Sequence, residues 1–417
     1  MIISNSTQAP GSDIFDPMTP SNLQEPFVFF AKLRGEKPVY WNAQYSFWML
    51  TRYQDVKAVL KAPRQFSSAT GVEIEKRAEQ IPQSARASFD IGKRFWYTAI
   101  QATDPPKHTD QRGAVMNAFT PRVVAEMRTS IQQRVNHLLD EMERAATCDF
   151  VSEFAYPLPS LVIFDLLGVP AEDHEAMREA TQAVVMFPSS VYQGDLVRME
   201  HIAERLTRAQ GVLERLIQQR RREPKNDLIS VLLHAETGTT QLPDDEIVVL
   251  CNFLLAAGHE TTANLLGGSL RYLLERRELW EQLGAAREMI PTAVEELLRF
   301  VSPVLWVSRL PAEDIEFDGH LLRKGARLQL GIGAANHDPA EFPNPEQLDF
   351  TRPKVNALAF GYGAHFCLGA ALARIETQVA LSSLLDRIPK VQLGTRHFKY
   401  EPLYFLRALK SLPIRLK

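Results

Sequence analysis

The amino-acid sequence predicts a mainly α-helical fold with small β-sheets (α+β). Helical periodicity dominates from Pro121 to Leu298. Within this region, the stretch from about Asp244 to Arg277 predicts a single helix, which would span roughly 50 Å at 1.5 Å per residue. Short runs with the β-branched and aromatic bias of strands lie before and after the helical region. A helix of that length crosses a whole domain, so we expect its middle to be buried.

The first part of the chain alternates between helical and strand-like patterns. Residues 26–34 and 53–61 have a helical pattern, whereas residues 39–41 (VYW) and 47–51 (FWMLT) predict short strands. Residues 67–100 mix charge, glycine and aromatic side chains without clear periodicity, which predicts a long surface loop with a short helix. Loops of this kind often form the walls of binding sites.

No stretch of the chain predicts a membrane span. The most apolar run of the long helix, Ile247 to Gly258, is far shorter than the roughly 20 residues that cross a bilayer, and His259 and Glu260 follow it directly. The chain also begins without the basic, apolar and small-residue segments of a signal peptide. We therefore expect a soluble, cytoplasmic protein with no membrane insertion.

Beyond Arg299 the pattern changes to short strands, at residues 315–319 (IEFDG) and 326–332 (ARLQLGI). A loop crowded with proline follows at residues 337–353 and leads into a glycine-rich turn. The last helix is expected to begin near Leu368 and to pack inward along one face. That face carries the apolar side chains of Leu368, Leu372, Ile375 and Val379.

Composition argues against two kinds of protein. The 417 residues include 47 lysines and arginines against 50 aspartates and glutamates, a formal net charge of -3, which is no footprint for a nucleic-acid partner. The three cysteines, Cys148, Cys251 and Cys367, are too few and too scattered for a disulfide framework, and they fit a reducing cytosol. One of these cysteines stands in the most informative motif of the chain.

That motif is residues 360–369 (FGYGAHFCLG), a glycine-rich turn that delivers Cys367 to the start of a helix. Gly361 and Gly363 permit positive φ and close backbone approach, so the turn can bend beneath a flat ligand and aim amide N–H groups at the sulfur. The helix N-terminus favours negative charge as well, so both effects favour a thiolate, and coordination to iron would deprotonate the thiol outright. The alternative is a buried structural cysteine in a glycine turn.

The motif resembles the haem-binding loop of the cytochrome P450 family, and the resemblance continues through residues 369–381 (GAALARIETQVAL) to cover nearly the whole chain. It implies the cytochrome P450 fold in a single domain over residues 1–417, with residues 1–20 as a loose N-terminal arm and the long helix crossing the haem. Cys367 would be the axial ligand of the iron of haem b (iron protoporphyrin IX), and electron donation from its thiolate would favour O–O cleavage. Further cofactor contacts in this loop would come from Phe360, Gly361 and Gly369.

In the long helix, residues 257–262 (AGHETT) resemble the oxygen-activation segment of the family. The resemblance implies that Ala257 and Gly258 leave room above the iron, which would give a use to a glycine that costs a helix about 1 kcal/mol. Glu260 and Thr261 would be the catalytic acid–alcohol pair: Thr261 hydrogen-bonds the oxygen being activated, and Glu260 feeds protons from solvent. The alternative is a satisfied hydroxyl and a charge at a helix bend.

His259 and Glu260 also match the beginning of a zinc-protease motif. That motif requires a second histidine one helical turn after the first. Position 263 is Ala263, so the sequence does not support metallohydrolase chemistry.

Two sets of charged residues extend the resemblance. Glu296 and Arg299 lie three apart on a predicted helix, and Arg352 lies in the proline-rich loop where the third charge of the family belongs. The implied structural ion-pair triad would fix the loop leading to Cys367, although an ordinary surface pair is the alternative. Four further residues match the family's contacts to the haem propionates: His108, Arg112, Arg309 and His365. Each of these four side chains could instead be a solvated surface group.

The resemblance also assigns a substrate pocket. Its walls are expected to include Trp96, Phe253, Ala256, Leu305 and Phe405. This partly aromatic set suits a lipophilic small-molecule substrate whose binding is driven by burial. One departure from the family pattern is His337, where an arginine is more usual, and it puts one surface contact in doubt but not the chemistry.

The chain is most similar to the soluble bacterial type, which implies electrons from NAD(P)H that arrive through a ferredoxin reductase and a ferredoxin. The predicted reaction is the activation of O2 with two electrons and the hydroxylation or other oxidation of the substrate by a monooxygenase. Two alternatives remain. One is a haem-thiolate peroxygenase, which would more typically lack the acid–alcohol pair, and the other is a noncatalytic haem-binding sensor.

Overall fold

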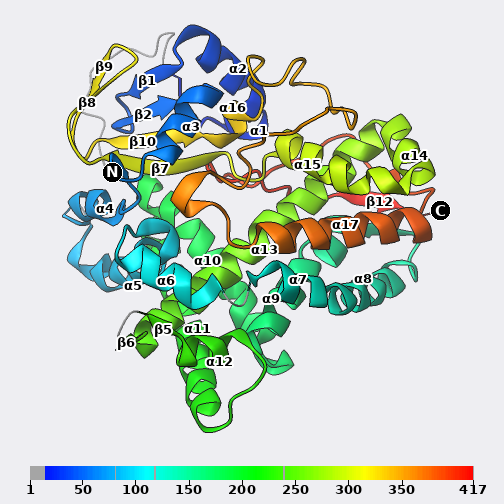
Figure 1. Ribbon diagram of the computed structural model, residues 1–417, viewed down its shortest axis with the longest axis horizontal. Coiled ribbons are helices and arrows are strands. Elements are labelled where there is room, and N and C mark those ends of the chain that lie inside the picture. Colours follow the sequence, from blue (N-terminus) through cyan, green and yellow to red (C-terminus); the bar gives the residue numbers. More distant parts are fainter. Residues whose placement is uncertain (1–14, 80, 117–118, 238–239, 417) are drawn as a thin grey trace.

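The computed structural model describes residues 15–79, 81–116, 119–237 and 240–416. It shows a large helical region beside a smaller region of strands (Figure 1), which confirms the prediction of a mainly α-helical fold with small sheets. The α-helices are α1 (Pro20–Gln24), α2 (Pro26–Glu36), α3 (Tyr53–Lys61), α4 (Gly71–Ala78), α5 (Arg86–Tyr97), α6 (Lys107–Met116), α7 (Pro121–Glu126), α8 (Arg128–Met142), α9 (Pro157–Leu167), α10 (His174–Gln193), α11 (Leu196–Arg222), α12 (Leu228–His234), α13 (Asp244–Glu275), α14 (Arg277–Ala285), α15 (Ile290–Val301), α16 (Ile332–Ala335) and α17 (Ala370–Arg387).

The strands are β1 (Val39–Asn42), β2 (Phe47–Leu50), β3 (Phe66–Ser67), β4 (Thr147–Asp149), β5 (Glu236–Thr237), β6 (Thr240–Gln241), β7 (Trp306–Pro311), β8 (Ile315–Phe317), β9 (His320–Leu322), β10 (Arg327–Gly331), β11 (Gln392–Leu393) and β12 (Pro413–Arg415). The largest sheet has the order β1-β2-β10-β7-β3, and a second has the order β11-β12-β4. Leu330 of β10 pairs with Leu50 of β2 in parallel and with Val307 of β7 in antiparallel register. The largest sheet thereby joins the beginning of the chain to the segments just before the glycine-rich turn.

The long helix α13 runs through the middle of the helical region (Figure 1). Its 32 residues agree with the predicted span to within two residues, and α14 begins directly after Arg276. Helices α9, α10 and α17 pack against it, and side chains around its middle, such as Leu250, Leu255 and Leu266, are buried. In the described ranges of the chain, no helix is both long enough and apolar enough to cross a membrane.

The prediction of a long surface loop at residues 67–100 is wrong. This segment contains the helices α4 and α5, and α5 packs against α10 and α11. Phe89, Gly92 and Phe95 are buried on α5 at a spacing of three residues, so they share one helical face. The charged residues between them hide this periodicity in the sequence.

One further expectation fails and another is tested only for its last residues; in both places, side chains that were placed at the surface pack inside. Of the expected N-terminal arm, residues 1–14 lie outside the described residues, but Phe15 is buried and its ring meets that of Tyr40 edge to face at 5.3 Å. His337 is also buried, and its ring lies 4.1 Å from that of Phe27. Its Nδ1 lies 3.0 Å from the carbonyl oxygen of Gly333, so His337 makes a core contact and not a surface contact.

The segment that leads to the last helix agrees with the sequence in outline. Residues 337–353 contain no helix or strand, and α17 begins at Ala370, two residues later than expected. Leu372 and Val379 are buried, as the predicted inward face requires. Leu368 precedes the helix and is only partly buried, because it belongs to the turn that carries Cys367.

A close approach between α5 and α10 gives a test of the corrected structure. A Cβ atom added at Gly92 would lie 2.2 Å from Cδ2 of Phe187. We predict that Gly92→Ala lowers the free energy of unfolding by about 1–3 kcal/mol, although alanine is the better helix former. The matched control is Gly211→Ala in α11, where no atom lies within 4 Å of the added Cβ, and it should stabilise by about 0.5–1 kcal/mol. Urea unfolding would measure both changes, and equal effects would contradict the close approach.

Candidate active site

A cavity of about 410 Å³ lies beside the middle of α13. Its walls come from α6, α13, β7, the turn before α17 and the segment 404–406, and most of the lining side chains are apolar. The cavity brings together the residues that the sequence assigned to cofactor binding and to catalysis. They are His108, Arg112, Ala257, Gly258, Glu260, Thr261, Arg309, Phe360, Gly361, His365, Cys367 and Gly369.

The turn before α17 presents Cys367 to this cavity. The amide of Cys367 donates a hydrogen bond of 2.9 Å to the carbonyl oxygen of Phe360, which closes the turn. Gly361 and Gly363 have φ values of 70° and 74°, in the left-handed region that favours glycine. A Cβ atom at Gly363 would also lie 2.6 Å from the carbonyl oxygen of Leu60. The two glycines therefore allow the tight bend that the sequence predicted.

Burial opposes ionisation of the Cys367 thiol. It raises the pKa of Cys367, whereas the amide of Gly369 and the guanidinium groups of Arg112 and Arg374 act in the opposite direction with a smaller effect. The Gly369 amide therefore favours the thiolate in the expected direction, but burial outweighs its effect on the pKa of Cys367. Coordination to a metal cation would supply the missing positive charge, because a coordinating thiol is deprotonated.

Four basic residues gather on another wall of the cavity. His108 and Arg112 come from α6, Arg309 comes from β7, and His365 ends the 3₁₀ turn η7 (Gly363–His365). The imidazole rings of His108 and His365 lie 4.0 Å apart, and Nε2 of each is buried without a hydrogen-bond partner among the described residues. His108 and Arg309 are buried, so they are not solvated surface groups.

The electrostatics of these four residues indicate an anionic ligand. Burial lowers the pKa of Arg309 to about 10, and burial together with Arg309 lowers that of His365 to about 3. Asp104 is the acid that acts on Arg309 in the opposite direction. Two carboxylates placed here would accept hydrogen bonds from the unpartnered nitrogens and offset the crowded positive charge. The wall therefore fits the propionates of haem, with Cys367 in the same cavity to hold the iron.

The oxygen-activation segment of α13 faces the same space. The hydroxyl of Thr261 donates a hydrogen bond of 2.8 Å to the carbonyl oxygen of Ala257 one turn earlier. A Cβ atom at Gly258 would lie 3.3 Å from Cδ1 of Ile163, so this glycine also lets α9 approach closely. Glu260 is buried, and burial raises the pKa of its carboxyl to about 7. This carboxyl can therefore take up and release a proton near neutral pH.

The sequence analysis missed the partner of this carboxyl, Tyr156. The Tyr156 hydroxyl donates a hydrogen bond of 2.5 Å to Oε1 of Glu260. The neighbouring residue His259 uses both ring nitrogens in the core, one at 2.9 Å from the carbonyl oxygen of Tyr156 and the other at 3.1 Å from the hydroxyl of Thr181. No sequence pattern connects these residues, because Tyr156 lies 104 positions before Glu260.

A second residue missed by the sequence analysis is Glu376 of α17. It lines the cavity, and burial raises the pKa of its carboxyl to about 8. Its Oε2 atom has no hydrogen-bond partner among the described residues. Glu376 lies within residues 369–381, so its place beside the cysteine motif was the available signal.

The predicted substrate walls are present with one exception. Trp96 lies between Phe253 and Phe405, with ring centroids 6.5 Å and 5.5 Å away, and all three line the cavity with Ala256. Leu305 does not line the cavity and packs instead beside Gly333. Its neighbours Val304 and Trp306 do line the cavity, because successive side chains of an extended segment point in opposite directions.

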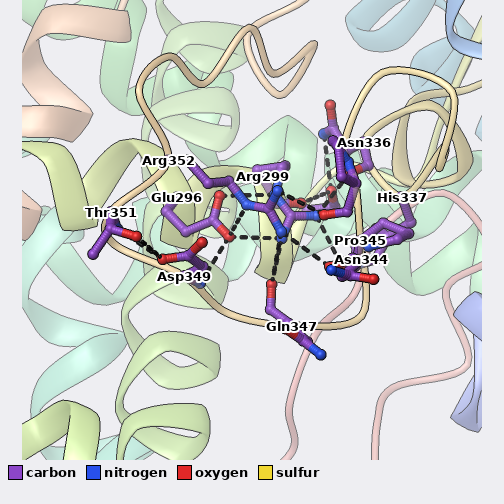
Figure 2. Close-up of polar contacts among 12 residues, drawn as sticks. Glu296, Arg299, Asn336, His337, Asn344, Pro345, Gln347, Asp349, Thr351 and Arg352 are labelled. Atoms are coloured by element: carbon purple, nitrogen blue, oxygen red, sulfur yellow. Dashed lines mark hydrogen bonds and ion pairs between the residues drawn. The ribbon is translucent and has the colours of Figure 1, made fainter.

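The turn that carries Cys367 is preceded by a loop that a buried ion-pair network fixes to α15 (Figure 2). The Arg299 guanidinium donates hydrogen bonds of 2.7 and 2.8 Å to the two carboxylate oxygens of Glu296, and both side chains are 0% exposed. Arg352 donates to Glu296 at 3.0 Å. The remaining donors of the two arginines reach loop carbonyl oxygens, among them those of Pro345 and Gln347. Complete burial excludes the alternative of an ordinary surface pair.

Comparison with known proteins gives a consistent result. The cytochrome P450 family model matches residues 18–389. The polyketide biosynthesis cytochrome P450 PksS of Bacillus subtilis (strain 168) is 37% identical over 412 residues, which cover 97% of this chain and 98% of that protein. Its solved structure, from the bacillaene polyketide synthase, is similar with a TM-score of 0.86 at 36% identity, covering 97% of this chain and 100% of that chain.

Two other solved structures are nearly as similar. P450BioI, in complex with an acyl carrier protein ligated to hexadec-9Z-enoic acid, has a TM-score of 0.84 at 33% identity, with 95% of this chain and 99% of that chain covered. CYP109E1 from Bacillus megaterium, in complex with testosterone, has a TM-score of 0.83 at 32% identity, with 96% of this chain and 100% of that chain covered. The similarity therefore extends over both the helical and the strand-rich regions.

The buried network around Glu296 gives a test of what holds the loop in place. We predict that Glu296→Gln lowers the free energy of unfolding by about 3–5 kcal/mol, because it leaves the buried guanidinium of Arg299 without a counter-charge. The matched control is Glu281→Gln, which removes an exposed partner of Arg277 and should cost less than about 1 kcal/mol. Urea unfolding measures both, and similar small losses would show that the buried network is not needed.

Proposed function

Because the chain belongs to the cytochrome P450 family and is a monooxygenase, we propose that it uses O2 and two electrons from a separate redox partner to oxidise a lipophilic small molecule. One observation carries the proposal. A single cavity joins Cys367 to the basic wall, where Nε2 of His108 and Nε2 of His365 have no partner among the described residues, and to the acid–alcohol pair of α13.

Different residues of this cavity would bind the iron and the propionates of haem b. Cys367 would provide the sulfur ligand, and Arg112 and Arg309 would bind the propionates with His108 and His365. When bound, haem supplies the iron at which O2 is activated and an oxygen atom is passed to the substrate. The apolar walls exclude water from the space between the cofactor site and α13.

Glu260 and Thr261 of α13 would deliver protons to the cavity. Glu260 has a carboxyl with a pKa of about 7, and the next residue, Thr261, carries a hydroxyl at the cavity wall. A group with a pKa near the working pH is suited to pass protons repeatedly. Glu260 would bring protons into the cavity, and Thr261 would donate a hydrogen bond at the place where oxygen is reduced.

The substrate class follows from the aromatic wall. Trp96, Phe253 and Phe405 present large apolar surfaces to the cavity, which favours a substrate bound by burial. Similar proteins have been crystallised with testosterone and with a carrier-bound hexadecenoic acyl chain, both of which are lipophilic. We propose hydroxylation of a C–H bond, or an equivalent oxidation, of such a molecule.

The electrons would come from NAD(P)H through a ferredoxin reductase and a ferredoxin in the cytoplasm. Tyr362 and Phe366 are exposed on the turn that carries Cys367, so a donor protein can approach the sulfur side of the site closely. The similarity to bacterial relatives such as PksS supports the same supply route.

The acid–alcohol pair also weighs against the main alternative within haem chemistry. A peroxygenase takes its oxygen from peroxide and does not need a group that brings two protons to O2, yet Glu260 and Thr261 both line the cavity. Product formation that depends on NADPH and a surrogate ferredoxin system would separate a monooxygenase from a peroxygenase and from a noncatalytic sensor.

The sulfur ligand can be tested by Cys367→Ala. We predict complete loss of the thiolate signature from the carbon monoxide difference spectrum, because no other sulfur lies in the cavity wall formed by the described residues. The matched control is Cys148→Ala, which removes a buried sulfur on β4 and should keep the signature. A Cys367→Ala protein that retained the signature would overturn the assignment.

The hydroxyl on α13 can be tested by Thr261→Ala. We predict continued oxygen consumption with a several-fold larger share of electrons released as peroxide, because the hydrogen bond that guides proton delivery is lost. Peroxide and product would be measured per NADPH consumed. Thr377→Ala is the control, since the Thr377 hydroxyl makes the same bond one turn back, 2.7 Å to Ala373, on α17. Unchanged coupling in Thr261→Ala would remove this residue from the proposal.

A further inference from the structure

The Glu260 carboxyl has a hydrogen-bond partner from outside α13, the hydroxyl of Tyr156. Resting on the function proposed above, we propose that Tyr156 is a positioning residue for proton delivery: its hydroxyl holds the Glu260 carboxyl in place, with polar side chains of α10 on its other side. The contact that suggests this is the 2.5 Å hydrogen bond from the Tyr156 hydroxyl to Oε1 of Glu260.

Two contacts with α13 fix the position of Tyr156. Its carbonyl oxygen lies 2.9 Å from Nε2 of His259, and a carbonyl can only accept, so the proton must be on that nitrogen. The rings of the two residues also meet edge to face at 4.0 Å. Consecutive residues of the long helix, His259 and Glu260, thus bind the backbone and the hydroxyl of the same tyrosine. These contacts hold the tyrosine backbone and ring against the same turn of α13 that carries the carboxyl.

The other side of the Tyr156 hydroxyl faces α10. The side chains of Thr181 and Gln182 act on it from this helix and lower the pKa of Tyr156, against the larger effect of burial. Thr181 is buried, whereas the next residue, Gln182, is exposed. A hydroxyl can donate one hydrogen bond and accept others, so Tyr156 can donate to Glu260 while it accepts from α10. The Tyr156 hydroxyl therefore lies between the Glu260 carboxyl and polar side chains of α10.

The charges around Glu260 explain why a neutral partner matters. In the described parts of the chain, no lysine, arginine or histidine forms an ion pair with Glu260. Burial raises the pKa of its carboxyl, the Tyr156 hydrogen bond lowers it, and Glu401 of the C-terminal segment raises it further, with a result of about 7. An ion pair would hold the carboxylate ionised, but a hydroxyl donor leaves it able to bind a proton.

The neighbouring groups do not titrate in the same range. Burial lowers the pKa of His259 to about 4, and Arg178 acts in the same direction. Burial and Glu260 raise the pKa of Tyr156, so its hydroxyl stays protonated. Near neutral pH, Glu260 is therefore the group of this cluster that changes its charge. In each delivery it passes one proton toward the cavity and takes one back from solvent water, with no net change in Tyr156.

The test is Tyr156→Phe, read by infrared titration of the protonated carboxyl band of Glu260 in the holoenzyme. Glu260→Gln identifies the band by its disappearance. Without the Tyr156 hydroxyl, the hydrogen bond that lowers the pKa of Glu260 is lost, while burial still raises that pKa. We therefore expect the midpoint of the band to move up by about one pH unit. The pH at which electrons are best coupled to product should move up with it, and the share released as peroxide should rise. The control is Tyr272→Phe, which removes the hydroxyl of a different buried tyrosine, on α13. It should change neither the midpoint, nor the best pH for coupling, nor the share of peroxide.

Two results separate this inference from the function on which it rests. A wild-type protein without a thiolate spectrum or product would end the proposed function, whatever the carboxyl does. A Tyr156→Phe protein with the wild-type midpoint and coupling would overturn the role of Tyr156 alone. If that variant does not fold, Gln182→Leu replaces it: loss of the polar side chain behind the Tyr156 hydroxyl predicts more peroxide per product, and an unchanged share of peroxide would refute the role of Tyr156.

Discussion

The buried position of the Cys367 sulfur, in the turn before α17, is the constraint on which the rest of this structure depends. Burial raises the pKa of the Cys367 thiol, and the nearby amide and guanidinium groups offset only part of that effect. A cation bound at this sulfur would complete the charge balance, as the proposed role of Cys367 as an iron ligand requires. The polypeptide must also hold the sulfur in one place, and the positive φ values of Gly361 and Gly363 with the buried Glu296 network do so from the two sides of the turn.

The two ends of the cavity use opposite electrostatic arrangements. On the wall formed by α6 and β7, basic groups crowd together, and burial lowers the pKa values of His108 and Arg309, so an anionic ligand is favoured. On α13, Glu260 has a hydroxyl as its partner and keeps a pKa near neutrality. The first arrangement is suited to permanent binding of a charged cofactor. The second is suited to repeated exchange of protons, because neither state of the carboxyl is strongly favoured.

Local sequence patterns predicted the parts of the site that lie in continuous segments. The turn at residues 360–369 and the span of α13 were predicted from glycine placement and periodicity, and the structure agrees. The failures are of a different kind. Residues 67–100 contain two α-helices where the pattern indicated a loop with one short helix, because charged residues separate the buried positions of α5. Leu305 was misplaced because a shift of one residue in extended chain turns the side chain away. Tyr156 was missed because its contact with α13 exists only after α9 packs against that helix.

The missed contact shows why the environment of a catalytic group is harder to predict than the group itself. The residue types in AGHETT indicate what chemistry the segment can perform, but the pKa of Glu260 depends on burial and on a hydroxyl from another helix. Both are properties of packing. Because α9 and α10 supply the polar groups behind Glu260, any change that shifts these helices relative to α13 alters proton supply without touching the cavity wall. If Glu260 delivers protons as proposed, the packing of these three helices belongs to the catalytic apparatus as much as the cavity wall does.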